Sequence, residues 1–281
     1  MNKKFYTLRN DLVFKNVFLK DKKRIKWLLD GILNMNVEIY NISNCELYKD
    51  RLYIRSKTID SIIDTNYAYF NIELNDTFND NKKIRNFYYQ TSYLNQLVHV
   101  KEDYVSMEKP IIQININVSN TNTLEIINKY SINDNITYDE YLNIFYIINI
   151  NIDKIIDKWY NKLNQDLDYF NKYKYLLIIG MDEEKLKNLE VNDDMIKEIK
   201  EDVITLNKNP EFYQVMTEKE DNRRMMNTMF KEGETLGYER GIEQGIVQEK
   251  ITNARKMKKE KIPCETIQEI TGLSLKTIKS L

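Results

Sequence analysis

The feature that most constrains the fold is a series of segments whose residue patterns predict β-strands. They lie on both sides of a segment whose pattern predicts a helix. The clearest is Pro110 to Val118, where Ile alternates with Gln and Asn, and this period of two predicts a strand. β-Branched and aromatic residues predict further strands at 59–63, at about 69–75 and at 144–150. Residues 84–99 lack Gly and Pro and carry apolar residues at helical spacing, so they predict a helix.

Two more regions are expected to be helical. Apolar residues within 11–33 fall at three- and four-residue spacings, which predicts one or two amphipathic helices with a charged interruption at Lys20 to Arg24. Residues 152–215 are expected to be mostly helical, apart from Tyr175 to Gly180, an apolar run that also suits a short strand. The order of elements predicts an α/β fold with helices packed on a central mixed sheet.

Composition narrows the chemistry, because the 281 residues include a single histidine, two Cys and seven Gly. One histidine excludes zinc sites built from several His, and a Ser-His-Asp or Cys-His catalytic group would need His99, which we expect at the surface near a helix end. Cys45 and Cys264 are too far apart in sequence to indicate a disulfide framework or a zinc site. No glycine-rich phosphate loop is present. An enzyme of this composition would depend on carboxylates, amides, Lys, Arg and Tyr, and phosphodiester hydrolysis assisted by a hard metal ion fits that set.

The sequence also carries predictions about location. The N-terminus turns polar within its first residues and has no apolar region typical of a secretory signal. The longest apolar stretches, at 144–150 and 175–180, are far shorter than the roughly 20 residues that span a bilayer. We therefore expect a cytoplasmic protein with no membrane partner.

Residues 57–75 predict a hairpin that carries the candidate active site. With Asn66 and Tyr67 as a two-residue turn, Asp60 lies directly opposite Glu73 on one face of the strand pair. Directly opposed carboxylates repel each other, and a shared divalent cation such as Mg²⁺ would compensate. The alternative is a different register or a solvated face.

Motifs in this region and on both sides of it carry a family resemblance. In order, they are Asp11-Leu12-Val13-Phe14-Lys15, then Lys57-Thr58-Ile59-Asp60 followed by Ile72-Glu73-Leu74-Asn75, and then Arg85-Asn86-Phe87-Tyr88-Tyr89 with Tyr93. Their order and spacing across residues 8–118 resemble the Rpn family of recombination-promoting nucleases and transposases. That family belongs to the PD-(D/E)XK nuclease superfamily, so the resemblance implies a PD-(D/E)XK core and a DNA endonuclease that uses Mg²⁺, with Mn²⁺ as a substitute.

The resemblance also implies roles for particular residues. Asp60 and Glu73 would bind the metal, and Asn75 occupies the catalytic position where the superfamily carries Lys and this family usually Gln. Because Asn75 cannot supply a cation, a second hypothesis stays open: a catalytically weak or inactive nuclease-fold protein that acts in DNA binding or assembly. The formal net charge of −1 also argues against tight non-specific binding of DNA by the whole molecule.

Further residues would assist the site. Asp11 would be an outer metal ligand or, alternatively, a helix N-cap. Lys15 would contact DNA phosphate or only solvate its helix. Arg85 and Tyr89, four residues apart and so on one helix face, would contact DNA, or would be an exposed charge beside a core aromatic.

The C-terminal part patterns differently, and we expect a domain boundary between residues 1–215 and 216–281. Gly233, Gly237, Gly241 and Gly245 recur every four residues in a long helical stretch, although each costs roughly 1 kcal/mol in a helix. They predict a packing seam for a helix of a second subunit or, alternatively, a solvated connector. A Gly-rich helix after the core is also similar to the Rpn family.

Residues 262–281 predict two short helices around a Gly turn, either a helix-turn-helix DNA-binding unit or a small helical cap.

Overall fold

The fold is described from a computed structural model. The structure describes residues 4–19, 21–46, 58–75, 79–99, 109–118, 125–162 and 166–281. Lys20 and Lys57, which belong to patterns discussed above, lie outside these residues, as do the side chains of Asp60 and His99.

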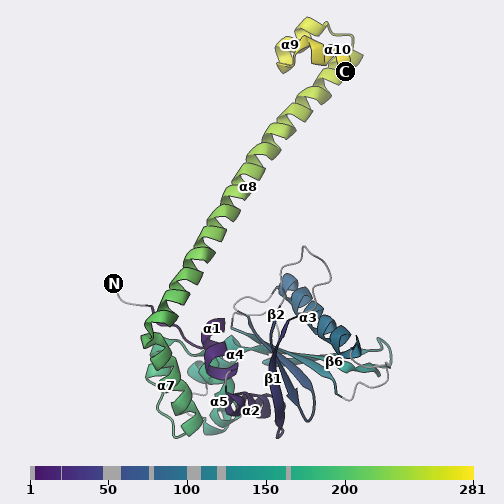
Figure 1. Ribbon diagram of the computed structural model, residues 1–281. Coiled ribbons are helices and arrows are strands. Elements are labelled where there is room, and N and C mark those ends of the chain that lie inside the picture. Colours follow the sequence, from purple (N-terminus) through teal and green to yellow (C-terminus); the bar gives the residue numbers. More distant parts are fainter. Residues whose placement is uncertain are drawn as a thin grey trace. The chain divides into compact units, whose positions relative to one another are not determined.

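The N-terminal part is built on one mixed β-sheet, as the alternating segments predict (Figure 1). Within the described ranges it has six strands in the order β1-β2-β3-β4-β6-β5. The three central strands β3, β4 and β6 run parallel, while β1, β2 and β5 add antiparallel pairs at the two sides. The strands are β1 (Ile39–Glu46), β2 (Thr58–Thr65), β3 (Tyr69–Asn75), β4 (Ile111–Asn117), β5 (Ile127–Asn133) and β6 (Glu140–Asn151).

Helices cover both faces of this sheet (Figure 1). The 20-residue helix α3 (Asp80–His99) lies on one face, and α1, α2, α4 and α5 lie on the other. The fold is therefore the predicted α/β arrangement of a mixed sheet flanked by helices. The remaining helices of the N-terminal part are α1 (Asp11–Phe14), the π-helix η1 (Lys15–Leu19), α2 (Lys22–Leu33), α4 (Ile152–Lys162), α5 (Leu167–Gly180), α6 (Glu183–Lys187) and α7 (Asp194–Lys208).

The two faces of the central strands differ in chemistry. In β4, Ile112, Ile114 and Ile116 alternate with amide residues, and every residue of the strand is buried. The isoleucines join the apolar core on the side of α1 and α4, whereas the amides face α3. Strand alternation thus separates an apolar face from a buried polar face, which we call the amide face.

The expectation of a short strand at Tyr175 to Gly180 is wrong, because these residues form the end of helix α5. A short apolar run suits a buried helix as well as a buried strand, and here burial on all sides explains the pattern. Two glycines permit the close packing: a Cβ on Gly31 would lie 2.3 Å from the Tyr175 ring, and one on Gly180 would lie 2.4 Å from Ile152. The Tyr175 hydroxyl also donates a hydrogen bond to the Gly31 carbonyl at 2.5 Å.

The charged interruption expected in the first helical region lies where η1 ends and α2 begins, with Asp21 as the N-cap of α2. Arg24 is not solvated there. Its side chain is buried, donates to the Val17 carbonyl at 3.1 Å and pairs with Asp202 on α7 at 2.6 Å. The charge therefore ties the N-terminal helices to α7.

A second compact unit spans Pro210–Leu281. It contains the 50-residue helix α8 (Pro210–Lys259), followed by α9 (Cys264–Thr271) and α10 (Leu275–Ser280). Gly272 between α9 and α10 has φ +69°, as the predicted Gly turn requires. Across the described residues, no helix is both long enough and apolar enough to cross a bilayer.

Candidate functional site

The candidate site is centred on Glu73, on the amide face of β3. The described β2–β3 ladder pairs Ile62 with Asn71, Ile63 with Phe70 and Asp64 with Tyr69, which is the register expected from the hairpin turn. Glu73 is only 6% exposed. A buried carboxylate is costly unless it has a charged or hydrogen-bonding neighbour, so its surroundings decide what it can do.

Asp60 belongs to strand β2, but its side chain is outside the described residues. Continuing the observed register would place its backbone opposite Glu73. The pairing of the two carboxylates therefore stays a prediction.

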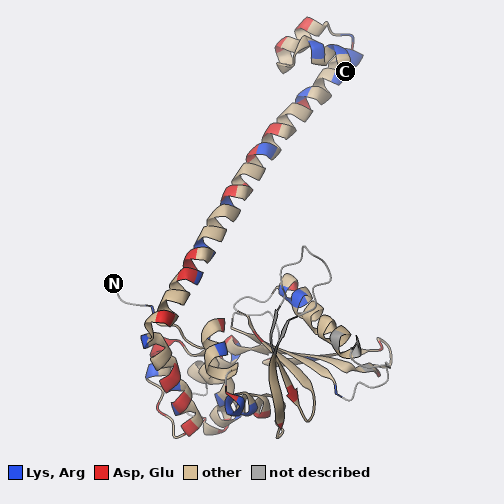
Figure 2. Ribbon diagram, viewed as in Figure 1, with Lys and Arg blue, Asp and Glu red and all other residues tan. Residues whose placement is uncertain are grey.

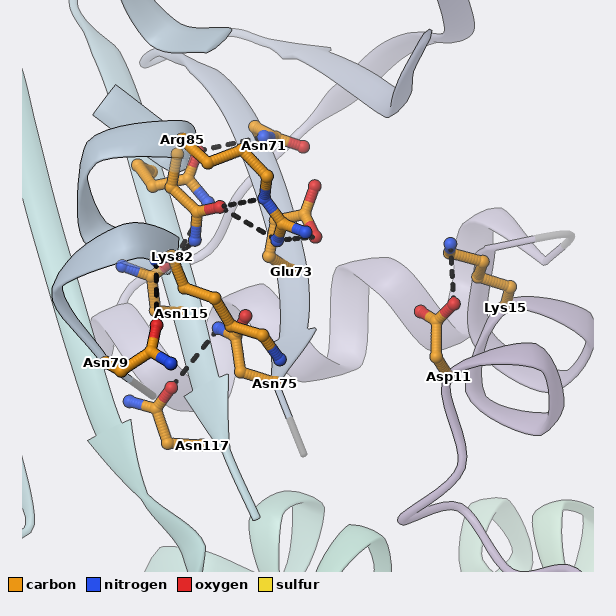
Figure 3. Close-up of polar contacts among 12 residues, drawn as sticks. Asp11, Lys15, Asn71, Glu73, Asn75, Asn79, Lys82, Arg85, Asn115 and Asn117 are labelled. Atoms are coloured by element: carbon orange, nitrogen blue, oxygen red, sulfur yellow. Dashed lines mark hydrogen bonds and ion pairs between the residues drawn. The ribbon is translucent and has the colours of Figure 1, made fainter. Parts of the chain in front are cut away.

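Arg85 on α3 pairs with Glu73 (Figure 3), and its guanidinium lies beside the Tyr89 ring. The Arg85 Nη2 atom is 3.7 Å from Glu73 Oε2, and the guanidinium lies 5.7 Å from the centre of the Tyr89 ring. Arg85 also donates two hydrogen bonds to Asn86 Oδ1, at 3.0 and 3.1 Å. Because the Arg85 side chain is 42% exposed, this cation connects the buried carboxylate with solvent.

Asn75, two residues beyond Glu73, is completely buried. Its Nδ2 donates to Asn117 Oδ1 on β4 at 3.2 Å, and its own Oδ1 is buried without a hydrogen-bond partner among the described residues (Figure 3). Asn75 is thus held by an amide and offers an unused oxygen on the same face as Glu73.

Asp11 and Lys15 pair with each other and lie apart from Glu73 and Arg85 in Figure 3. The Lys15 Nζ is 2.8 Å from Asp11 Oδ2, across one helical turn. The alternative role of Asp11 as an N-cap is wrong, because Asn10 caps α1 by accepting from the backbone N–H groups of Leu12 and Val13. Asp11 instead lies in the first turn, where a carboxylate is favoured by the helix dipole.

The oxygen atoms of Glu73 and Asn75 are of the type that bind a hard metal cation. A carboxylate and an unpaired amide oxygen, from Glu73 and Asn75, are the ligand types that Mg²⁺ prefers. However, the described side chains include no group of three or more His, Cys, Asp or Glu that could hold a metal ion. The expected partner carboxylate, Asp60, lies outside the described side chains.

The feature that sequence reasoning missed is a continuous hydrogen-bonded array of amides beside Glu73, buried except for the half-buried Asn149. Asn71 donates to Gln113 at 2.8 Å, Gln113 to Asn115 at 3.1 Å and Asn115 to Asn149 at 2.7 Å. Asn86 on α3 also donates to Asn115, at 2.7 Å. The signal was the alternation of Ile with Gln and Asn in 110–118, which predicts a strand but does not tell whether its polar side is buried.

A pocket of about 240 Å³ opens between α3 and this face. Four amide residues and two aromatic rings line most of it: Asn86, Gln113, Asn115, Asn149, Phe87 and Tyr130. Glu73 pairs with Asn115 in the β3–β4 register, so the pocket lies next to the candidate site. Lys82, Lys83 and Arg85 place three cations near the start of α3, where Figure 2 shows blue segments.

Comparison with known proteins adds no assignment. No family model matches the chain, and no curated protein matches it either. The fold and the site define an α/β protein with a buried carboxylate and an amide-lined pocket on one sheet face. Its function must be argued from these residues.

Proposed function

We propose that the protein is a metal-dependent DNA endonuclease with a PD-(D/E)XK-like core. The observation that carries this proposal is the buried Glu73 carboxylate on a central strand, beside Arg85 and on the same face as the unpaired Asn75 oxygen. The β2–β3 register, extended by two residues, would bring Asp60 opposite Glu73.

Each residue has a part in the proposed reaction. Asp60 and Glu73 would hold Mg²⁺, with the Asn75 amide oxygen as a further neutral ligand. A bound Mg²⁺ lowers the pKa of a coordinated water and polarises the scissile phosphate. Arg85 would exchange its contact with Glu73 for a contact with the DNA phosphate, which its exposure permits.

One observation favours a second candidate, a nuclease-fold protein that binds DNA with little or no cleavage. Asn75 is neutral and its amide is committed to Asn117, so no cation stands two residues beyond Glu73. A site without that charge would stabilise the developing negative charge of the transition state less well.

The test is a plasmid-nicking assay with the full chain. We expect Mg²⁺-dependent nicking that stops in EDTA and falls at least about 100-fold in Asp60→Asn and in Glu73→Gln, since even residues around metal ligands cost 10- to 100-fold. Asp64→Asn is the matched control, because it removes a carboxylate from the same strand. Asp64 pairs with Lys109 at 2.8 Å and has no part in the proposed site.

The outcomes separate the two candidates. Nicking at full rate in both Asp60→Asn and Glu73→Gln would show that the proposed site is wrong. DNA binding without metal and without nicking in the unaltered protein would support the second candidate instead.

A further inference from the structure

The amide array ends in unused hydrogen-bonding groups beside the pocket. Its donors run in one direction, from Asn71 through Gln113 and Asn115 to Asn149, and the Asn149 Nδ2 has no partner among the described residues. Asn128, which pairs with Asn149 in the β5–β6 register, carries a buried Oδ1 that also lacks a partner. A buried acceptor without a partner is unfavourable, so a ligand that supplies the missing bonds would be stabilised here.

The unused groups at the end of the amide array match the hydrogen-bonding edge of a nucleobase. A donor and an acceptor from two neighbouring side chains can bind the acceptor and donor atoms of a nucleobase edge, as the two amide atoms of a single Asn or Gln side chain do. Asn128 lies on the same strand face as Tyr130, two residues along β5, and Tyr130 lines the pocket. Asn149 lines the pocket directly, and Asn128 lies next to it, opposite Asn149 in the β5–β6 register.

The aromatic residues of the pocket favour a flat ligand. Phe87 and Tyr130 are 46% and 47% exposed, which leaves large parts of their rings uncovered. Stacking on aromatic side chains is a common way to hold an unpaired base. A volume of about 240 Å³ is smaller than the pockets of roughly 300–1,000 Å³ that take drug-sized ligands, and it suits a single planar ring system.

Charge favours a ligand that carries phosphate. Among the described residues, the pocket lining includes Lys83 and no carboxylate, and Lys82 and Arg85 are neighbours of Lys83 on α3. Lys83 contacts Asp80 at 2.9 Å, but the Asp80 side chain is 86% exposed, so this ion pair is weak. A monosaccharide would use the amides and the rings but not this cationic helix end.

We propose that this pocket binds one unstacked nucleobase, with the attached phosphate near the cationic start of α3. Because Asn115 lies beside Glu73 in register, a nucleotide held here would place its backbone near Glu73 and Arg85. The proposal adds a base-binding site to the proposed nuclease. It does not depend on cleavage, so the two can fail separately.

The test is isothermal titration calorimetry of the full chain in EDTA with the four deoxynucleoside monophosphates and with 2-deoxyribose 5-phosphate. We expect at least one nucleotide to bind about tenfold or more tightly than the sugar phosphate, because only the nucleotide fills the amide-lined pocket. Equal binding of the sugar phosphate, or no nucleotide binding, would overturn the proposal. So would displacement of the nucleotide by N-acetylglucosamine, which would indicate a sugar site.

Variants assign the binding to the pocket. Asn149→Ala should weaken nucleotide binding about tenfold, whereas Asn143→Ala, at an exposed position on the same strand, should leave it within about twofold. If Asn149→Ala unfolds in a circular dichroism melt, Tyr130→Ala keeps the test usable, since this ring is half exposed. Its control is Tyr141→Ala, which is 79% exposed. Unchanged affinity in both Asn149→Ala and Tyr130→Ala would contradict the proposal even if plasmid nicking succeeds.

Discussion

At the scale of single residues, oppositely charged neighbours stabilise the carboxylates of Glu73 and Asp193. Glu73 is buried but lies within 3.7 Å of a partly exposed guanidinium, so its charge is compensated by a group that solvent and ligands can reach. Removing the Arg85 cation would take one charged neighbour away from a buried carboxylate, which is unfavourable. In the proposed site, a metal ion would take the place of Arg85 as the cation beside this carboxylate.

Asp193 shows how such neighbours set pH dependence. Burial alone would raise the pKa of Asp193, but hydrogen bonds from Lys174 Nζ at 2.6 Å and from the Ile196 backbone N–H outweigh burial and hold the pKa below its ordinary value of 3.8. A depressed pKa in the folded state means that the charge stabilises the fold above the ordinary pKa. That stabilisation is lost as pH falls through the folded-state pKa.

We therefore predict that Asp193→Asn, which keeps the helix cap of α7 but removes the charge, lowers the free energy of unfolding by about 1 kcal/mol at pH 7. At about pH 2 the difference should vanish, because the native carboxyl is then protonated. Urea unfolding at both pH values measures this. Asp194→Asn is the control, since that side chain is 91% exposed and should change little. An equal loss of stability at both pH values would show that the charge is not responsible.

At the level of elements, glycine has opposite roles in the two helical regions. A Cβ on Gly180 would meet Ile152 at 2.4 Å and Ile156 at 2.6 Å, so this glycine is required by packing. A Cβ on Gly233, Gly237, Gly241 or Gly245 of α8 would meet nothing within 4 Å among the described atoms. Packing within the described chain therefore does not explain the α8 glycines.

We predict that replacing all four α8 glycines by Ala raises the helix stability by about 0.5–1 kcal/mol per residue, because Ala loses less conformational freedom. The expected readout is a higher helical signal and a higher midpoint in thermal circular dichroism. Gly180→Ala should do the opposite, since it forces Ile152 and Ile156 to move.

The same variant tests the proposed seam with a second subunit. If a partner helix approaches closely at these glycines, sedimentation velocity should show self-association in the unaltered protein and its loss in the four-fold Ala variant. A monomeric unaltered protein would contradict the seam.

At the scale of the whole molecule, the chain divides into two compact units, Met1–Asn209 and Pro210–Leu281. In the C-terminal unit, Ile267 of α9 is fully buried with Ala254 of α8 and Ile278 of α10. Lys258 closes this cluster by donating to the carbonyls of Ile278 and Lys279, both at 3.0 Å. Positive and negative side chains are interspersed along α8, so this helix carries no long run of one charge (Figure 2). DNA binding would then depend on local cations such as those at the start of α3.

We predict that the α9–α10 cap unfolds separately from the sheet of the N-terminal unit. Ile267→Ala should destabilise the α9–α10 cap by about 2–4 kcal/mol, and hydrogen exchange should speed up in α9, α10 and the end of α8. Peptides from β3 and β4 should keep their exchange rates. Ile270→Ala is the matched control on the same helix, because Ile270 is 60% exposed. Faster exchange in β3 or β4 would show that the two units unfold together.

Local periodicity in the sequence was enough to predict much of this fold. The strands at 69–75, 110–118 and 144–150, the helix ending at His99 and the two C-terminal helices around Gly272 are all confirmed. Each depends on the spacing of apolar residues or on a backbone angle within a few residues, and such information is present in a short segment. The position of Glu73 on a strand face, with Asn75 on the same face, followed from the same alternation.

Tertiary structure alone decided what covers each face. Periodicity shows that one side of β4 is polar, but only helix α3 packed over it makes those amides a buried, hydrogen-bonded array. The helical state of Tyr175 to Gly180 likewise follows from burial among residues distant in sequence. The physical reason is that burial depends on contacts between distant segments, which no local pattern contains.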